Sequence, residues 1–206
     1  MLAKMIYFVF YYREYRMKYI QTEIAGLWII EPKVLSDSRG YFMESFKQEV
    51  FNQNVGKVDF IQENESGSSR GVLRGLHYQL APYSQAKLVR VIEGTVLDVA
   101  VDLRKGSPTF GKYMAVELSG QNKRQFYIPQ GFAHGFHVLS ERAVFTYKVD
   151  NPYMPSHERS LRLMIRRLGL TGRLQIRKML SSLKKIKMRR CWRKPTLIIF
   201  TNIHQR

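Results

Sequence analysis

The stretch Lys87-Leu-Val-Arg-Val-Ile-Glu-Gly-Thr-Val-Leu-Asp-Val-Ala-Val-Asp-Leu103 decides the fold class. Two apolar runs flank Glu93-Gly94, and after the glycine the residues alternate along the chain. One side has Leu97, Val99, Val101 and Leu103, and the other has Val96, Asp98, Ala100 and Asp102. A period of two is the pattern of a β-strand, and a short connection with glycine favours a hairpin. We therefore expect residues 87–92 and 95–103 to form a β-hairpin.

Short strand-like runs separated by turn residues continue on both sides of this stretch. The sequence predicts a polar loop at 62–70, one or two helical turns at 47–54, and further strands at 113–118, 125–128 and 143–149. Many short strands with little helix are typical of an antiparallel sandwich or jelly roll and not of a parallel α/β sheet. We expect an all-β fold.

The positive charge is concentrated at one end of the chain. The formal net charge is +18, but residues 163–206 hold thirteen of the 34 basic residues and no Asp or Glu. Residues 17–162 carry a net charge of +3 and have an ordinary globular composition. The basic end alone favours a nucleic-acid partner.

The first residues are expected to lie outside the fold. Residues 1–16 are aromatic-rich without a clean period, and Arg13-Glu14 can be encoded by a purine-rich ribosome-binding sequence upstream of Met17. We therefore expect residues 1–16 to be a translated leader. No cleavage site for a signal peptide follows the early apolar run, and no run reaches the length of a membrane span. A single cysteine, Cys191, makes the cytoplasm the expected compartment.

Two clusters of residues carry the candidate chemistry. Residues 70–90 place His77 and Lys87 on predicted strands, and Ile128-Pro-Gln-Gly-Phe-Ala-His-Gly-Phe136 surrounds His134 with glycines and aromatic rings. An imidazole can exchange a proton near neutral pH, and a lysine can stabilise a developing anion. A strand histidine is also often purely structural. A metal site is a further rival, but neither cluster has the spacing of three converging ligands, so we expect no metal.

Several motifs together resemble one family. Arg74-Gly-Leu-His-Tyr-Gln79, Gln85-Ala-Lys-Leu-Val-Arg90, Ser107-Pro-Thr-Phe-Gly111 and the cluster at 128–136 occur in the order found in dTDP-4-dehydrorhamnose 3,5-epimerases, and the likeness runs from about Met17 to Arg162. The resemblance implies a cupin-type jelly roll. It also implies inversion of C3 and C5 of dTDP-4-dehydro-6-deoxy-D-glucose, giving dTDP-4-dehydro-L-rhamnose. No cofactor is implied, because the substrate's own ketone acidifies both C–H bonds.

The resemblance also implies roles for individual residues. His77 is the general base, Lys87 stabilises the enolate oxygen, and Tyr147 is the acid on the other face. The residues implied in substrate binding are Arg39, Phe42, Glu44, Gln62, Asn64, Arg74, His134 and Tyr153. Of these, Phe42 and Glu44 are expected to reach the nucleotide from the neighbouring subunit of a homodimer. Each of these residues also has an ordinary structural interpretation.

The likeness stops abruptly after Arg162. Read one nucleotide earlier, Met164-Ile-Arg-Arg-Leu-Gly-Leu-Thr-Gly172 can encode Asp-Asp-Pro-Ala-Leu-Gly-Ile-Asp-Trp, a segment expected of the family at this place. The same shift lets Ser182-Leu-Lys-Lys-Ile186 encode Leu-Ser-Glu-Lys-Asp, whose acid is expected to pair with the base histidine. We therefore expect residues 163–206 to be a frameshifted tail, and the epimerase activity of this chain to be impaired.

Three alternatives stay open from the sequence. The chain could invert only one carbon of a dTDP-4-keto sugar, or isomerise its keto group. It could instead bind a sugar nucleotide without catalysis. The third alternative is a functional basic tail that binds nucleic acid through its phosphates.

Overall fold

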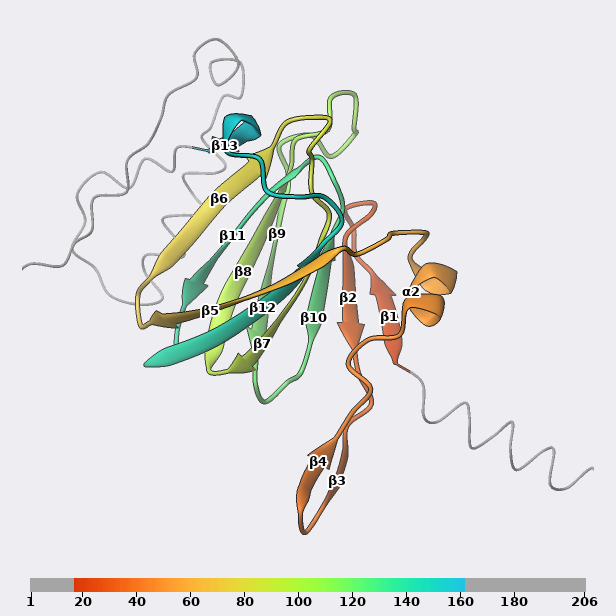
Figure 1. The fold of residues 1–206 in the computed structure, drawn as a ribbon, viewed down its shortest axis with the longest axis vertical. Coiled ribbons are helices and arrows are strands. Elements are labelled where there is room, and N and C mark those ends of the chain that lie inside the picture. Colours follow the sequence, from red (N-terminus) through yellow and green to blue (C-terminus); the bar gives the residue numbers. More distant parts are fainter. Residues whose placement is uncertain (1–16, 162–206) are drawn as a thin grey trace, which may run out of the picture.

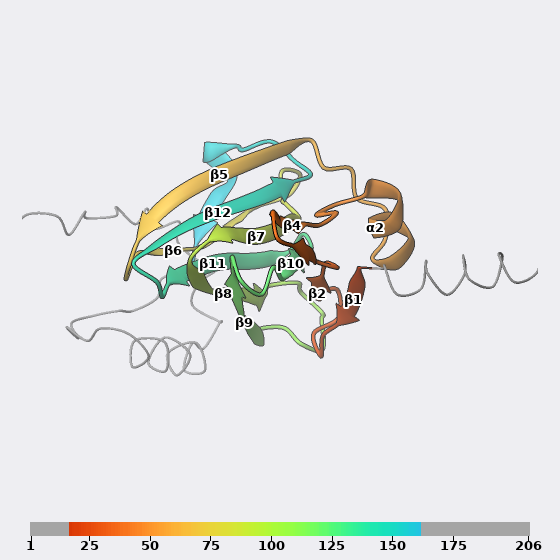
Figure 2. The same cartoon turned by 90° about the horizontal axis from the view of Figure 1, so that it is seen from below.

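Two antiparallel β-sheets packed face to face make up the body of the protein (Figures 1 and 2). The computed structural model describes residues 17–161. The predicted leader at 1–16 and the predicted frameshifted tail at 163–206 lie outside the described residues. The all-β, antiparallel jelly-roll expectation is confirmed for the described part of the chain.

The six-stranded sheet has the order β1 (Lys18–Gln21), β2 (Trp28–Glu31), β10 (Gln125–Ile128), β7 (Lys87–Glu93), β12 (Arg142–Val149) and β5 (Gln62–Ser69). The five-stranded sheet has the order β13 (Glu158–Ser160), β6 (Leu73–Gln79), β11 (Phe132–Val138), β8 (Thr95–Asp102) and β9 (Tyr113–Ser119). A separate hairpin of β3 (Leu35–Asp37) and β4 (Gly40–Phe42) projects from the sandwich (Figure 1). Within residues 17–161 the helices are α2 (Gln48–Asn54) and the short 3-10 helix η1 (Pro155–His157).

The main core lies between the two sheets. Phe126 and Phe145 are fully buried there, and Phe136 of β11 stacks on Phe145 of β12 with ring centroids 4.2 Å apart. Because β11 and β12 belong to different sheets, this contact holds the two layers together. Burial of each such side chain stabilises the fold by roughly 1.5–3 kcal/mol.

The prediction of a hairpin at 87–103 is wrong, because the two strands do not pair with each other. Both strands form, but β7 pairs with β10 and β12, whereas β8 pairs with β9 and β11. The chain crosses between the sheets at Gly94, where φ is +80° and a Cβ would clash with the carbonyl oxygen of Arg142. Alternation predicts a strand but does not indicate which neighbour it pairs with, and this corner has the same turn residues as a hairpin.

The expected polar loop at 62–70 is also wrong. Residues Gln62–Ser69 form β5, which pairs with β12 along its whole length. The strand lies at the edge of its sheet, where polar side chains are tolerated, so it has no apolar signal. The prediction at 47–54 is confirmed as α2, whose Phe51 is fully buried among the rings of Phe46, Phe60 and Tyr127.

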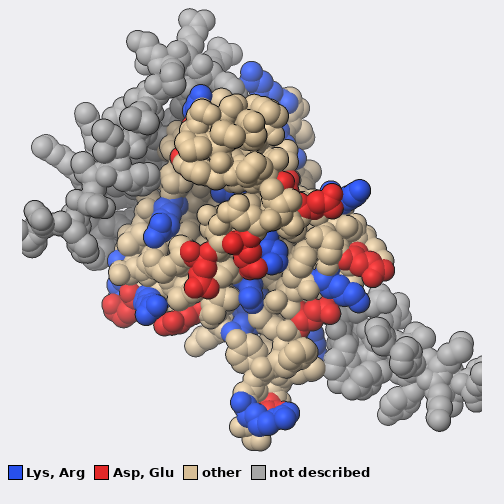
Figure 3. Space-filling model, viewed as in Figure 1, with Lys and Arg blue, Asp and Glu red and all other residues tan. Residues whose placement is uncertain are grey.

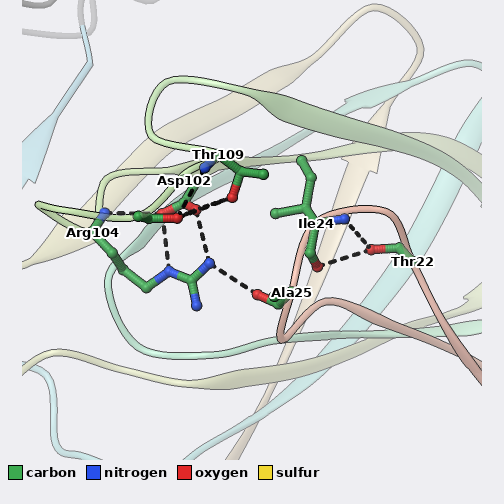
Figure 4. A network of polar contacts seen from close by, with 7 residues as sticks. Thr22, Ile24, Ala25, Asp102, Arg104 and Thr109 are labelled. Carbon is green, nitrogen blue, oxygen red and sulfur yellow. Dashed lines mark hydrogen bonds and ion pairs between the residues drawn. The ribbon is translucent and has the colours of Figure 1, made fainter.

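A buried carboxylate secures the loop that follows β8 (Figure 4). Asp102 has a fully buried side chain and accepts bonds from the Arg104 guanidinium at 2.8 and 3.0 Å, Ser107 at 2.7 Å and Thr109 at 2.6 Å. Arg104 also donates to the carbonyl of Ala25 at 2.9 Å, so the same group ties the loop before β2 to the end of β8. Burial alone would raise the pKa of Asp102, but these hydrogen bonds lower it well below the ordinary value.

We expect Asp102→Asn to lower the free energy of unfolding at pH 7 by about 2–3 kcal/mol, since charge-assisted bonds in a buried site are lost. The folded-state pKa of Asp102 is depressed, so its contribution is present above the unfolded pKa and is lost as the pH falls below it. Urea unfolding between pH 7 and pH 2 therefore should show a gap between wild type and variant that shrinks in acid.

Asp37→Asn is the matched control, because Asp37 pairs with Arg39 on the surface, with both side chains mostly exposed. This change is expected to alter stability by less than about 0.5 kcal/mol. Equal losses at the two positions would contradict the role assigned to the Asp102 network.

Candidate active site

One cavity of about 390 Å³ is lined by residues from strands of both sheets. The described residues that line it come from β5, β6, β7, β12, β13 and the loops between them. They are Gln62, Asn64, His77, Tyr78, Gln79, Gln85, Lys87, Tyr147, Tyr153 and Glu158. All three predicted catalytic residues are among them.

The backbones of β6 and β11 approach each other closely at two glycines. At Gly75, with φ +113°, a Cβ would lie 2.5 Å from the Cα of Gly135, so only glycine fits. Two residues further along β6, His77 stands opposite His134 of β11 in the register. The two sequence clusters, 70–90 and 128–136, are thus brought side by side.

His134 is held by a carboxylate that the sequence reasoning did not select. Its Nε2 lies 2.9 Å from both side-chain oxygens of Asp98, and both residues are buried. Asp98 occurs within the apolar alternation of β8, where a charged residue requires a partner. That position was the signal that could have identified it.

Burial sets the protonation of the two central groups. It lowers the pKa of His77, an effect that Glu158 opposes and Lys87 and His134 reinforce. Burial also lowers the pKa of Lys87, with Asp98 and Glu158 opposing that effect. His77 is therefore a neutral imidazole over a wider range of pH than a free histidine, so it is able to accept a proton.

Tyr147 supplies the third reactive group. The Lys87 ammonium lies 5.5 Å from the centroid of the Tyr147 ring. Burial raises the pKa of Tyr147, while nearby Arg74 acts in the opposite direction. The phenol therefore keeps its proton at neutral pH. A base, a cation and a proton donor in one cavity can remove a proton beside a carbonyl, stabilise the resulting oxyanion and return a proton.

The predicted binding residues divide into two groups. Gln62, Asn64 and Tyr153 line the cavity, and Gln62 donates to Asn64 at 2.7 Å. Arg74 and His134 are not among the lining residues. Arg74 is exposed, donates to Ser68 at 3.0 Å and lies close enough for its charge to act on Tyr147, while His134 is buried against Asp98.

Arg39, Phe42 and Glu44 do not line this chain's own cavity. They lie on or just after the projecting β3–β4 hairpin (Figure 1). Arg39 bonds to Asp37, and Phe42 is 70% exposed. The structure therefore does not bring these three residues to the catalytic groups of the same chain.

Glu158 is the second functional candidate that sequence reasoning missed. It lies on β13 and lines the cavity, and Tyr153 donates to it at 2.7 Å. Its segment lies within the range of the family likeness, but nothing in the local pattern indicates that its side chain lies near His77.

Within residues 17–161, no group of three or more His, Cys, Asp or Glu side chains is placed to hold a metal ion. In the same range no helix has both the length and the hydropathy needed to cross a membrane. Figure 3 shows acidic and basic side chains mixed over one face of the domain, without a continuous basic patch among the coloured residues.

Comparisons with known proteins agree with the motif likeness. A family model described as dTDP-4-dehydrorhamnose 3,5-epimerase matches residues 21–185. A protein of that name from Shigella flexneri is 60% identical over 146 residues, which cover 70% of this chain and 81% of the relative. A crystal structure of dTDP-6-deoxy-D-glucose-3,5-epimerase from Legionella pneumophila, in complex with dTDP-4-keto-L-rhamnose, matches with a TM-score of 0.70 and 53% identity. That match covers 72% of this chain and 79% of the other.

A more distant match has a narrower described activity. ChmJ, a 3'-monoepimerase from Streptomyces bikiniensis crystallised with dTDP-quinovose, is 32% identical with a TM-score of 0.66, over 81% of this chain and 89% of the other. The resemblance drawn from the motifs is confirmed by the family model and by these relatives. The chain belongs to the dTDP-4-dehydrorhamnose 3,5-epimerase family.

Proposed function

We propose that this protein is a cofactor-independent epimerase that inverts C3 and C5 of dTDP-4-dehydro-6-deoxy-D-glucose to give dTDP-4-dehydro-L-rhamnose. The observation that carries the proposal is the convergence of His77, Lys87 and Tyr147 on one cavity from β6, β7 and β12. The family and the sugar-nucleotide complex of the Legionella relative support the substrate class.

The chemistry follows from the ketone at C4 of the substrate. His77 takes the proton from the carbon next to the ketone, and the electron pair of the broken C–H bond becomes the enolate, with its charge on the C4 oxygen. Lys87 stabilises that oxygen. Tyr147 donates its proton to the opposite face of the same carbon, which inverts the centre. Solvent then restores both groups before the second carbon reacts.

The diphosphate and nucleotide require contacts beyond the sugar pocket. Arg74 is the proposed ligand of the diphosphate through charge-assisted hydrogen bonds, and the effect of its charge on Tyr147, a cavity residue, supports this role. Arg39, Phe42 and Glu44 would act on the substrate of a second copy, since in their own chain they lie away from the cavity and are exposed. This is the basis for a proposed homodimer, and the cytoplasm is the proposed compartment.

Inversion at one carbon is the second candidate function. The likeness to the 3'-monoepimerase of Streptomyces bikiniensis favours it. The shared fold and reactive groups would serve either reaction. The two candidates differ only in which C–H bonds exchange.

A frameshift near codon 162 completes the proposal. In the shifted reading frame the same codons can encode a segment with Asp-Asp-Pro and a segment Leu-Ser-Glu-Lys-Asp. The given sequence has no Asp or Glu after residue 162. A base histidine without its carboxylate partner loses orientation and support for its protonated form. The activity of the chain as written is therefore proposed to be low.

Exchange in D₂O, measured on the chain with its reading frame restored after codon 162, tests the reaction directly. We expect NMR to show deuterium entering both C3 and C5 of the 4-keto sugar, and His77→Asn to slow both exchanges by about 10²- to 10⁴-fold. His157→Asn is the control, because His157 packs on Tyr83 and does not line the cavity. Exchange at C3 alone would replace double epimerisation with the second candidate, and exchange at neither carbon would contradict both.

The substitution Lys87→Met tests whether Lys87 serves catalysis or the stability of the fold. Methionine has a similar length but no charge, so the substitution removes the cation whose pKa is lowered by burial. Asp98 keeps its bond to His134, and Glu158 keeps its bond to Tyr153. We expect unfolding free energy to rise by about 1–2 kcal/mol at pH 7 and exchange to fall by about 10²- to 10³-fold.

The matched control is Lys112→Met, on the surface before β9, which should change neither quantity. The lowered folded-state pKa of Lys87 means that the wild type gains stability as the pH rises through that pKa, while the Lys87→Met variant does not. Thermal unfolding across pH measures this. A variant that loses stability together with activity would assign Lys87 to the fold.

Restoring the reading frame after codon 162 tests the frameshift. The restored chain is expected to exceed the given chain in kcat/KM by about 10²- to 10⁴-fold, because the base regains its carboxylate. Rates of C3 and C5 exchange by the two purified chains make the comparison. If the restored chain is no faster, the tail does not account for any loss of activity.

A further inference from the structure

Glu158 stands on the same face of the five-stranded sheet as the proposed base. In the pairing of β13 with β6, Ser160 lies opposite His77 and Glu158 lies opposite Gln79. Side chains two positions apart on a strand share a face, so Glu158 is the diagonal neighbour of His77, with their Cα atoms roughly 7–8 Å apart. Both residues line the cavity.

We propose that Glu158 is a positioning residue of the epimerase, a counter-ion distinct from the carboxylate of the restored C-terminal segment, whose negative charge helps His77 hold a substrate proton beside the Lys87 ammonium. This inference rests on the proposed function for its purpose, although the electrostatic effect is measurable without substrate. It assigns Glu158 an action through His77 and no bond to the reacting carbon.

The carboxylate is held in place by its surroundings. Tyr153 donates to its Oε2 at 2.7 Å. The buried side chain of Gln79 accepts a bond from the backbone of Met154 at 2.6 Å and donates to the carbonyl of Pro152 at 3.1 Å, which anchors the segment leading to Glu158. Directly after β13, the backbone amide of Leu161 donates a hydrogen bond to the carbonyl of Leu76 on β6 at 2.9 Å. These contacts hold the Glu158 carboxylate in a fixed position at the cavity.

The groups around His77 show why a counter-ion is required. Lys87 faces it from β7, Tyr147 from β12 and His134 from β11, and burial has already lowered its pKa. Asp98 on β8 is bonded to His134 through both carboxylate oxygens. Glu158 is the one carboxylate among the described residues that line the cavity. When His77 accepts a proton, two neighbouring cations face each other, and Glu158 offsets their repulsion.

The direction of the effect follows from the charge. Glu158 raises the pKa of His77 relative to the value that burial alone would give. Glu158→Gln removes the charge and keeps the shape of the side chain, so the imidazolium becomes less stable and the pKa of His77 falls. The acid limb of the exchange rate then moves to lower pH, and the plateau rate decreases because the base is weaker.

The decisive measurement is an NMR titration of the His77 ring in the full chain without substrate, with the signal assigned by its loss in His77→Asn. We expect Glu158→Gln to lower the titration midpoint by about 0.5–1 pH unit. Tyr153→Phe, which removes the bond to the carboxylate but not its charge, should shift the midpoint by less than half as much. Glu117→Gln, at an exposed site on β9, is the charge-matched control and should not shift it.

Two outcomes would overturn the inference. One is a midpoint in Glu158→Gln that stays at the wild-type value, and the other is an equal shift in Glu117→Gln. Deuterium exchange as a function of pH gives a separate result for the proposed function. If the chain with the restored reading frame exchanges neither C3 nor C5, the proposed function fails whatever the titration shows. An unmoved midpoint in a chain that does exchange removes only the role of Glu158.

Discussion

The burial of the Lys87 ammonium is the constraint on which the site depends. Taking this cation out of water lowers its pKa, and the carboxylates that oppose the shift, Asp98 and Glu158, both come from the other sheet. Lys87 belongs to the six-stranded sheet, so the compensation exists only when the sandwich is closed. The buried charge of Lys87 is therefore offset only in the folded sandwich, which is also the arrangement that brings Lys87 into the cavity with His77 and Tyr147.

The same arrangement explains the glycines beside the histidines. Gly75 and Gly135 let the backbones of β6 and β11 come closer than any side chain would permit, and His77 and His134 stand opposite each other just beyond that point. Asp98 can then bond to His134 while His77 remains facing the cavity. One imidazole is tied to a carboxylate inside the sandwich, and the other is left to interact with Lys87 and Glu158. Two similar residues acquire different chemistry from their strand positions.

Sequence patterns predicted the strands better than their partners. The alternation in 95–103 correctly indicated β8, but the turn at Gly94 gave no sign that the chain changes sheets there. Polar β5 was mistaken for a loop because an edge strand carries no apolar signal. His77, Lys87 and Tyr147 could be selected because their motifs occur in a known family. Glu158 could not be related to His77, because its place depends on the register of a three-residue strand with β6, which no local pattern specifies.

The exposed β3–β4 hairpin extends this reasoning to a second copy of the chain. Phe42 is 70% exposed and Tyr41 57% exposed on the projecting hairpin. Lys123 contacts the Tyr41 ring and hydroxyl, so Phe42 is the large apolar side chain of the hairpin that is most available to a second copy. In a two-fold dimer each hairpin would meet the other copy through the same surface, and both sets of exposed residues would be covered at once. Arg39 would then add its charge to the cavity of the other copy, next to Arg74, the arginine proposed to bind the diphosphate. In the proposed homodimer, nucleotide binding and assembly would therefore depend on the same hairpin, while proton transfer at His77 would rely on groups within one chain.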